Sequence, residues 1–489
     1  MLIDEASAHL LRPRFLTTTT QNEIVLQGER VGVDDTRLLL GKPTPCVGRE
    51  PELALLELHL QRCIDESRAH ALVVIAPPGV GKSRLRHEFL RRIDGRDCQL
   101  LIGRGDPVSA GSPYGLLAQA LRHLCEIQLG DAADAAQGKL RARVAVHVAA
   151  ADVDRVTEFL GELCGIPFPD EGRTLLRAAR ADPKVMSDQV GRAFVDLIGA
   201  ECAVRPMLLV LEDLHWSDGL TVKLVEAALR ELELPLFVLA LARPDALDMF
   251  PGLWADHHDV LSLREISARA CELLVRQVLG KTAPDELVTR LVKRSAGNAL
   301  FLEELIRAAA EGKGDRLPET VLAILQTRLT RLDAPTRRLL RAGAVFGTTF
   351  WRDGVAELCG LDRASPELDA NLEIAVSQEL IERAKESRFA SEVQYAFRHA
   401  LMRDAAYGLL TDQDRREGHR HAAQYLERIG EPDPGVLADH YREGDDSTAA
   451  APLYCRAADQ AVAGHDLATA LRRVELGLKC GPEDRKSVV

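Results

Sequence analysis

Apolar residues are grouped along this chain in two different ways. In the first half, short runs of leucine and β-branched residues end in glycine, proline or charged residues, a pattern typical of buried parallel strands; these runs cover residues 71–76, 99–103, 207–211, 236–242 and 260–263. Elsewhere apolar residues recur at helical spacing, as in 51–65, 85–93 and most of 117–200, with a break near 165–172. Strands that alternate with helices predict an α/β fold, a parallel sheet with helices on both faces.

The first 45 residues are too few to bury a core of their own. They contain a helix-like stretch over 2–11 and strand-like runs over 15–20 and 24–28. We expect either the trailing end of an upstream domain or a small appendage packed on the α/β domain. A linker with Pro43 and Pro45 follows.

The rest of the chain divides into four predicted domains. These are an α/β domain over 46–265, an all-α helical domain over 266–345, a winged-helix-like domain with a small β-wing over 346–430, and the start of an α-solenoid over 431–489. The last segment holds alanine-rich helices over 436–442, 449–463 and 466–480, spaced like helical hairpins. Because solenoids need about three or more repeats, we expect the sequence to be an excerpt of a longer protein.

A glycine-rich turn joins the first strand of the α/β domain to a helix. It reads APPGVGKS over residues 76–83, close to the phosphate-loop pattern, with Ala76 where a glycine is usual. The two glycines let backbone N–H groups close around phosphate oxygens, and the helix adds the positive end of its dipole. Lys82 can reach the β- and γ-phosphates, and Ser83 can ligate Mg²⁺. The candidate nucleotide-binding residues here are Pro78, Gly79, Val80, Gly81, Lys82, Ser83 and Arg84.

Charged residues follow two other predicted strands. The strand over 207–211 runs directly into Glu212 and Asp213, and the strand over 236–242 ends at Arg243. Because the carboxyl ends of parallel strands line the ligand crevice of an open sheet, an acidic pair there is suited to Mg²⁺ and an attacking water. Arg243 at the same edge is a candidate contact for a γ-phosphate, although a surface arginine would look the same in sequence.

Composition narrows the class of protein. The chain has 489 residues and a net charge of −12, which disfavours a broad nucleic-acid-binding surface. No apolar run approaches the roughly 20 residues of a membrane span, and the N-terminus has no signal-peptide pattern. The ten cysteines include no C-x-x-C pair, which indicates neither a zinc site nor a disulfide framework. We therefore expect a cytoplasmic protein with reduced thiols and no membrane contact.

Several short motifs occur in an order that resembles one family. They are VGRE at 47–50, APPGVGKS at 76–83, SPYGLL at 112–117, VLEDLHWSD at 210–218, LALARPD at 239–245, GNALFLEEL at 297–305 and FRHALMRDAAY at 397–407. The chain resembles the signal-transducing ATPases with numerous domains, in particular the AAA-type bacterial module of large regulators that also carry nucleotide cyclase, protein kinase or LuxR-type domains. The tail resembles tetratricopeptide repeats, and the first 45 residues resemble the end of a class III cyclase-like domain without its catalytic residues.

The resemblance implies roles for individual residues. Glu212 corresponds to the Mg²⁺ ligand beside Ser83, Asp213 to the acid that polarises water, and Arg243 to the sensor arginine. Val47 and Arg49 would lie by the adenine, and His399 would occupy the place of a winged-helix histidine that contacts nucleotide in relatives. Glu212 stands where aspartate is more usual, and Ala299 replaces the proline common after Gly-Asn, so slow hydrolysis is expected.

Three functions compete at this level. The first is a slowly hydrolysing ATP/ADP switch with ATP and Mg²⁺ as cofactors. It would bind a protein partner or ligand through the C-terminal repeats, and a nucleotide-dependent oligomer is one form that the switch could take. The second is a DNA-bound regulator or origin-recognition-like ATPase, supported only by a local basic group: Arg415, Arg416, His419, Arg420 and His421. The third is a protein-interaction scaffold in which nucleotide is structural.

Overall fold

The computed structural model describes residues 2–3, 15–20, 23–29, 38–40, 42–43, 46–106, 112–310, 320–384, 387–463 and 466–480. The chain forms two compact units. Unit 1 comprises Met1–Leu58, Val80–Asp97 and Glu265–Gly314, and unit 2 comprises His59–Gly79, Cys98–Arg264 and Asp315–Val489.

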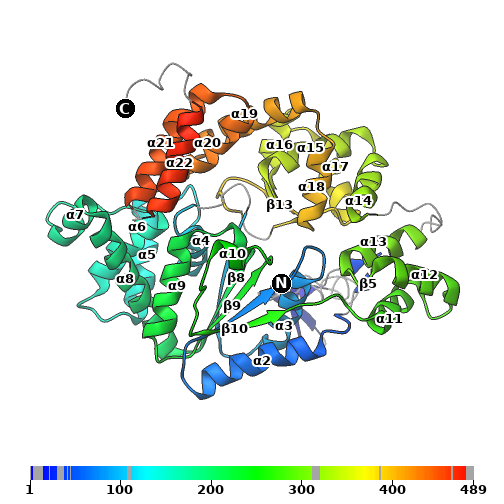
Figure 1. Cartoon of the computed structure of the whole chain (residues 1–489), viewed down its shortest axis with the longest axis horizontal. Coiled ribbons are helices and arrows are strands. Elements are labelled where there is room, and N and C mark those ends of the chain that lie inside the picture. The colour runs from blue at the N-terminus through cyan, green and yellow to red at the C-terminus, as the bar shows by residue number, and fades with distance from the viewer. Residues whose placement is uncertain are drawn as a thin grey trace. The chain divides into compact units, whose positions relative to one another are not determined.

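A five-stranded parallel sheet lies at the centre of unit 2 (Figure 1). Its strands, in the spatial order β10-β6-β9-β8-β7, are β10 (His258–Ser262), β6 (His70–Ile75), β9 (Leu236–Ala242), β8 (Met207–Glu212) and β7 (Gln99–Arg104). The register places Ile75 opposite Ala242 and Arg104 opposite Glu212. All five strands that the sequence pattern predicts are therefore confirmed, and their carboxyl ends share one edge.

Both faces of this sheet are covered. On one face, Val73, Leu209 and Val238 belong to a core with Leu121 and Phe194. That core is built with α4 (Gly115–Leu124), α8 (Pro183–Val204) and α9 (Gly219–Glu231), and α9 runs beside the sheet in Figure 1. On the other face, the C-terminal half of α2 (Glu50–Asp65) stacks the ring of His59 over Phe237, with the ring centroids 6.3 Å apart. The prediction of helices on both faces is confirmed.

A helical insertion separates β7 from β8. It contains α5 (Ala133–His147), α6 (Val153–Cys164), α7 (Thr174–Ala181) and α8, and the predicted break near 165–172 falls between α6 and α7. Asp182 starts α8 by accepting hydrogen bonds from the amides of Lys184 and Val185 at 2.9 and 3.4 Å.

Unit 1 holds the helix that follows the phosphate loop, α3 (Lys82–Ile93), together with the start of α2 and three more helices. Arg92 of α3 pairs with Glu50 at 2.7 Å and Glu57 at 3.4 Å on α2. The other helices are α11 (Ala268–Leu279), α12 (Asp285–Ser295) and α13 (Ala299–Ala310).

The N-terminal region corrects one prediction. A helix is expected over 2–11, but Leu2 and Ile3 form strand β1 (Leu2–Ile3), paired antiparallel with Val25 and Ile24. The reason is long-range pairing, which overrides local helical spacing. Residues 4–11 lie outside the described residues. The predicted strands are confirmed as β2 (Phe15–Thr20) and β3 (Glu23–Glu29), and two short strands follow, β4 (Leu38–Leu39) and β5 (Lys42–Pro43).

The remainder of unit 2 is mainly helical around a second core. A small antiparallel sheet, β11 (Thr349–Trp351), β13 (Gln394–Phe397) and β12 (Ile381–Arg383), packs Phe350 against Tyr395. The helices around it are α14 (Val321–Thr330), α15 (Ala334–Phe346), α16 (Arg352–Leu358), α17 (Pro366–Ser377), α18 (Ala400–Gly408) and α19 (Asp412–Ile429).

Three helices form the end of the described chain. They are α20 (Pro434–Glu443), α21 (Ser447–Ala463) and α22 (Leu467–Lys479), each at the place that the sequence pattern predicts. Tyr454 of α21 donates to Asp439 of α20 at 2.6 Å, and Arg473 of α22 reaches the same carboxylate at 2.9 Å. These polar contacts join the three helices.

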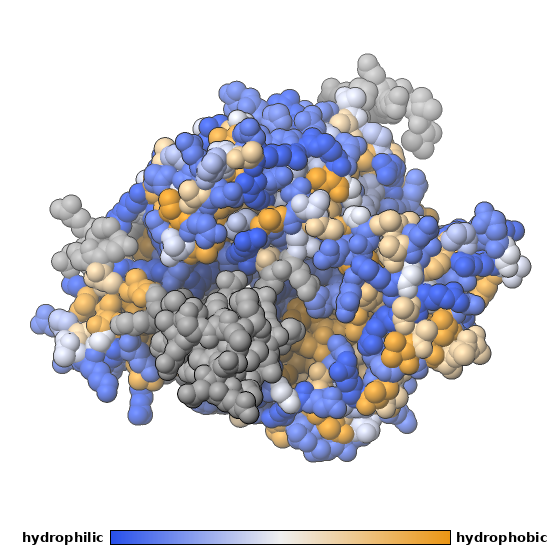
Figure 2. Space-filling view, turned by 180° about the vertical axis from the view of Figure 1, so that it is seen from behind, coloured by the Kyte–Doolittle hydropathy of each residue, from blue (hydrophilic) through white to orange (hydrophobic). Residues whose placement is uncertain are grey.

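The surface is largely polar. On the face shown in Figure 2, hydrophilic residues cover much of the area and hydrophobic residues form smaller groups between them. Among the described residues, no helix combines the length and apolar character needed to span a bilayer.

Candidate functional site

The phosphate loop has the backbone conformation that its glycines permit. Strand β6 ends at Ile75, and Gly79 and Gly81 adopt φ values of +82° and +110°. Gly81 is the N-cap residue of α3 and, as a glycine, has no side chain to cap that helix end. Amides in the first turn of a helix point outward with a partial positive charge, which is the arrangement that binds phosphate. Lys82 is half-buried in this turn and Ser83 is exposed.

Within unit 1 the loop lies beside the Gly-Asn turn that precedes α13. A Cβ placed on Gly81 would be 3.9 Å from the Cβ of Ala299. The turn itself is rigid, because Gly297 at φ +78° packs against the carbonyl of Ile266 and Asn298 accepts a hydrogen bond from the amide of Phe301 at 3.0 Å. Ala299, where the resemblance leads us to expect proline, is thus next to the phosphate loop.

Arg49 shapes the same loop from the start of α2. Its side chain is buried, and the guanidinium donates to the carbonyl of Val80 at 2.9 Å and to Glu52 at 3.1 Å. A buried arginine that holds a loop carbonyl fixes the loop's path. Val47 and Arg84 are each partly buried. An adenine contact by Val47 and Arg49 stays a prediction.

The predicted acidic pair lies at the carboxyl edge of the sheet. Glu212 ends β8, and its Oε2 is 2.7 Å from Nε of Arg104, the last residue of the adjacent strand β7. Asp213 follows in the left-handed conformation, with φ +50° and ψ +48°, and its side chain is 49% exposed. The buried ring of His215 lies 4.0 Å from its carboxylate.

Gly105 allows this acidic turn to pack against β7. Its amide donates to the carbonyl of Glu212 at 2.8 Å. A Cβ on Gly105 would lie 2.5 Å from the carbonyl oxygen of Asp213 and 2.9 Å from the Cβ of Trp216, which is too close for any side chain. Sequence reasoning missed both Arg104 and Gly105; the signal for them is an Arg-Gly pair at the end of a predicted strand.

Arg243 shares this edge. It follows β9, and its guanidinium carbon lies 5.8 Å from the centre of the Trp216 ring, within reach of a cation–π interaction.

Asp218, further along the acidic motif, is structural: it is fully buried and caps α9 by accepting hydrogen bonds from the amides of Leu220 and Thr221 at 3.0 and 2.9 Å. Burial raises the pKa of its carboxyl.

His399 is connected to the same edge through the small sheet. It lies two residues beyond Phe397 of β13, whose amide donates to the carbonyl of Thr348 at 2.8 Å. The Thr348 hydroxyl in turn donates to Asp106, two residues past the end of β7. This chain of contacts places the small sheet against the carboxyl end of β7. A nucleotide contact by His399 stays a prediction.

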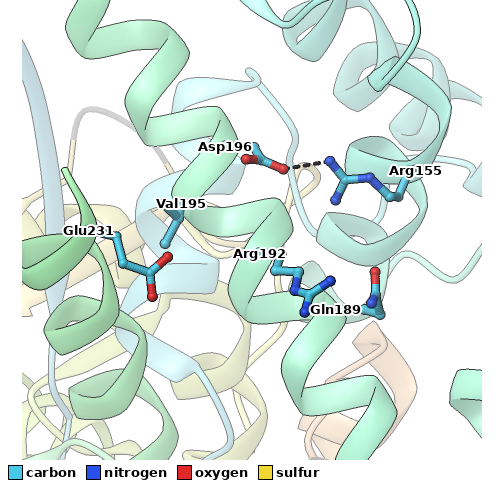
Figure 3. Close-up of a pocket in the computed structure, with 6 residues that line it drawn as sticks. All are labelled: Arg155, Gln189, Arg192, Val195, Asp196 and Glu231. Atoms are coloured by element: carbon cyan, nitrogen blue, oxygen red, sulfur yellow. Dashed lines mark hydrogen bonds and ion pairs between the residues drawn. The ribbon is translucent and has the colours of Figure 1, made fainter.

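A separate hollow of about 210 Å³ lies among the inserted helices (Figure 3). Its lining comes from α6, α8 and α9, and an ion pair of 2.5 Å between Arg155 and Asp196 crosses part of it. The lining residues are Arg155, Gln189, Arg192, Val195, Asp196 and Glu231. They include none of the residues that the sequence places at the nucleotide, so this hollow is distinct from the candidate site.

Comparison with known proteins identifies one domain. Residues 45–241 match the family model of the AAA ATPase domain, so the chain carries an AAA-type ATPase domain, which implies nucleotide binding. An uncharacterised protein of Rhizobium meliloti (strain 1021) is 25% identical over 456 residues, which is 88% of this chain and 42% of the relative.

The solved structures that match this chain differ strongly from it in sequence. One is a signal transduction ATPase with numerous domains and a tetratricopeptide repeat sensor from Pyrococcus horikoshii, at 13% identity and a TM-score of 0.48, covering 91% of this chain and 60% of that one. Another is the ORC1 protein of Aeropyrum pernix in complex with DNA, at 12% identity and a TM-score of 0.32, covering 75% of this chain and 94% of that one. The chain spans less than two thirds of the length of the uncharacterised relative and of the Pyrococcus protein.

Proposed function

We propose that this chain binds ATP with Mg²⁺, hydrolyses it slowly, and acts as a nucleotide-controlled switch within a multidomain signalling protein. The observation that carries the proposal is the phosphate loop, in which two left-handed glycines lead into the N-terminus of α3, where the N-cap residue is itself a glycine. Such a helix end binds phosphate through backbone amides, and Lys82 supplies the charge.

The chemistry of the available side chains fits Mg²⁺. The exposed hydroxyl of Ser83 and the carboxylate of Glu212 are oxygen ligands, which Mg²⁺ prefers. When bound, Mg²⁺ neutralises charge that develops on the phosphates. Because Arg104 holds one oxygen of Glu212, this carboxylate must share or release the arginine to act as a ligand. We take that competition as one reason for slow hydrolysis.

Asp213 is the proposed base. Its half-exposed carboxylate can accept a proton from water and orient the water for in-line attack on the γ-phosphorus. Arg243, positioned beside Trp216, is the proposed contact for the γ-phosphate. Its charge would stabilise the negative charge that builds up during transfer.

The switch part of the proposal is supported by contacts inside unit 2. The loop after β7 meets later parts of the chain through polar contacts: Asp106 with Thr348, and Ser112 with Asp433. Leu129 exchanges backbone hydrogen bonds with Arg388 and Ala390, at 3.0 and 2.9 Å. Polar contacts of this kind can separate at modest cost, so a ligand that alters the edge of the sheet can change how the C-terminal helices are held.

The last described helix supports binding of a protein partner through the C-terminal repeats. Leu467, Leu471, Val474 and Leu478 of α22 are 44–74% exposed and recur at helical spacing. A stripe of this kind on one side of a helix favours docking of another helix. We propose that this side of α22 meets a partner or a further repeat.

Two residues of the basic group on α19 weaken the DNA-binding alternative. Of the local basic group, His419 is buried and bonded to Tyr407 at 2.8 Å, and Arg415 packs 5.0 Å over the Tyr407 ring. His419 is therefore withdrawn from the surface and Arg415 is engaged by an aromatic ring, which leaves a smaller basic surface for phosphate contacts.

Two variants test the proposed function. Lys82→Ala should weaken ATP binding about 100-fold or more, because a charged contact to the phosphates is lost, while circular dichroism and thermal unfolding stay unchanged. Lys223→Ala, an exposed lysine on α9, is the matched control and should bind ATP normally. Undiminished ATP affinity in folded Lys82→Ala would contradict the assignment.

Asp213→Asn should retain ATP but lose turnover by about 10²-fold or more. Asparagine is chosen because it tolerates the left-handed backbone at this position. Asp245→Asn, exposed just beyond Arg243, is the control. Normal turnover in Asp213→Asn would assign the base to another group or deny hydrolysis by this chain.

A further inference from the structure

Two histidines and an aspartate meet at the end of the sheet opposite the phosphate loop. His70 is the first residue of β6, Asp259 is the second residue of β10, and His59 lies in the second half of α2. All three belong to unit 2. Because parallel strands all run the same way, residues at their amino ends are separated from the carboxyl edge by the length of the strands. The cluster is therefore distinct from the nucleotide site.

The three side chains converge on one point. Nε2 of His70 lies 3.1 Å and Nε2 of His59 lies 3.8 Å from the same oxygen, Oδ2 of Asp259. The two imidazole rings stack at 5.2 Å and are parallel to within 3°, and one ligand atom from each residue lies within 4.8 Å of the others. Ligands about 2.0–2.2 Å from a tetrahedral Zn²⁺ are separated by roughly 3.3 Å, so small side-chain shifts suffice to enclose an ion.

The surroundings suit a bound cation with one open position. His59 is buried against Phe237, whereas the Asp259 side chain is 58% exposed, so water can reach one side of the cluster. At pH 7.5 most imidazole groups are neutral, which is the form that coordinates metals. Arg62 and Arg68 place positive charge near the cluster, and the negative charge of the Asp259 carboxylate partly offsets it.

We propose that His59, His70 and Asp259 form a binding site for a divalent transition-metal ion, of which Zn²⁺ is the best match. Two imidazole nitrogens and one carboxylate are a common zinc ligand set, and water would complete the tetrahedron. The ion would link side chains of α2, β6 and the edge strand β10, in addition to the backbone pairing of β6 with β10 and the hydrogen bond between His70 and Asp259. Its effect would be to fasten an edge of the ATPase sheet.

The test uses the whole chain, freed of metal with a chelator and titrated with Zn²⁺ by calorimetry at pH 7.5. Wild type should bind one equivalent at this site, and Asp259→Asn, a change at an exposed side chain, should weaken it at least about tenfold. His70→Gln should do the same. His258→Gln, the neighbouring histidine on β10 that bonds to the carbonyl of Trp254, is the matched control and should bind like wild type.

Cobalt(II) identifies the ligands. In wild type, Co²⁺ should give visible bands of a four- or five-coordinate ion without the near-ultraviolet charge-transfer bands of a thiolate ligand, and Asp259→Asn should lose the visible bands. Equal affinity and equal spectra in wild type, Asp259→Asn and His70→Gln would overturn the proposal. Thiolate bands that persist in both variants would also overturn it, because they would place the metal on cysteine.

Discussion

At the scale of single residues, Asp213 combines a left-handed backbone conformation with the proposed role of general base. Its φ of +50° costs an L-residue about 1 kcal/mol or more. Gly105 stabilises this turn. The carbonyl of Asp213 packs on Gly105, and the amide of Gly105 donates a hydrogen bond to the carbonyl of Glu212. The position of the proposed base therefore depends on the absence of a side chain one strand away.

Gly105→Ala tests this dependence. The added methyl would overlap a backbone oxygen, so we expect the acidic turn to move, with about 1–3 kcal/mol of lost stability and a large fall in turnover. Gly138→Ala is the control, because Gly138 lies exposed in α5 with no atom near the added methyl and should gain up to about 1 kcal/mol. Normal ATP turnover in Gly105→Ala would show that the turn tolerates displacement.

At the scale of elements, sequence patterns located the parallel strands well, because the central strands β6, β9 and β8 are nearly continuous apolar runs buried on both faces. They failed where long-range pairing decides the structure. Leu2 and Ile3 join a sheet by pairing with Val25 and Ile24. The ion pair between Glu212 and Arg104 forms because the register of β7 and β8 places these two residues side by side. The cluster of His59, His70 and Asp259 was missed for the same reason, since nearly 190 residues separate its last two members.

A buried histidine pair joins α19 to α20. Nδ1 of His419 lies 2.9 Å from Nδ1 of His440, and Nε2 of His419 bonds to the hydroxyl of Tyr407 on α18. Burial lowers the pKa of His419 to about 3 and of His440 to about 4. The positive charge of Arg403 also lowers the pKa of both rings. Both rings are therefore neutral in the folded protein at neutral pH.

This pair predicts a loss of stability in mild acid. Unfolded histidines titrate near pH 6.5, so between pH 6.5 and about 4 the unfolded chain holds more protons. Stability is complete above that range and should fall by up to about 1.4 kcal/mol per pH unit per histidine as the pH drops through it. In urea denaturation at pH 7.5 and 5.5, His440→Gln should lose less stability between the two values than wild type. Exposed His421→Gln should behave as wild type, and an equal loss in all three proteins would refute the explanation.

At the scale of the whole molecule, the proposed switch requires the C-terminal helices to respond to nucleotide. The connection between α19 and α20 is anchored at two points: Glu431 pairs with Arg388 at 2.6 Å, and Asp433 contacts Ser112 beyond β7. Glu431 is fully buried, and burial raises the pKa of its carboxyl. A change at the carboxyl edge of the sheet that separates Ser112 from Asp433 would release one of these contacts and expose residues 430–435.

Limited proteolysis with ATP, with ADP and without nucleotide measures this response directly. We expect the rate of cleavage at residues 430–435 to differ between ATP and ADP in wild type, with Asp213→Asn held in the ATP pattern and Lys82→Ala insensitive to either nucleotide. Mass spectrometry of the fragments locates the cut and separates it from cleavage elsewhere. If wild type binds ATP and ADP but is cut at the same sites and rates in all three conditions, and turns ATP over rapidly without a partner, the chain is a constitutive ATPase and the switch is contradicted.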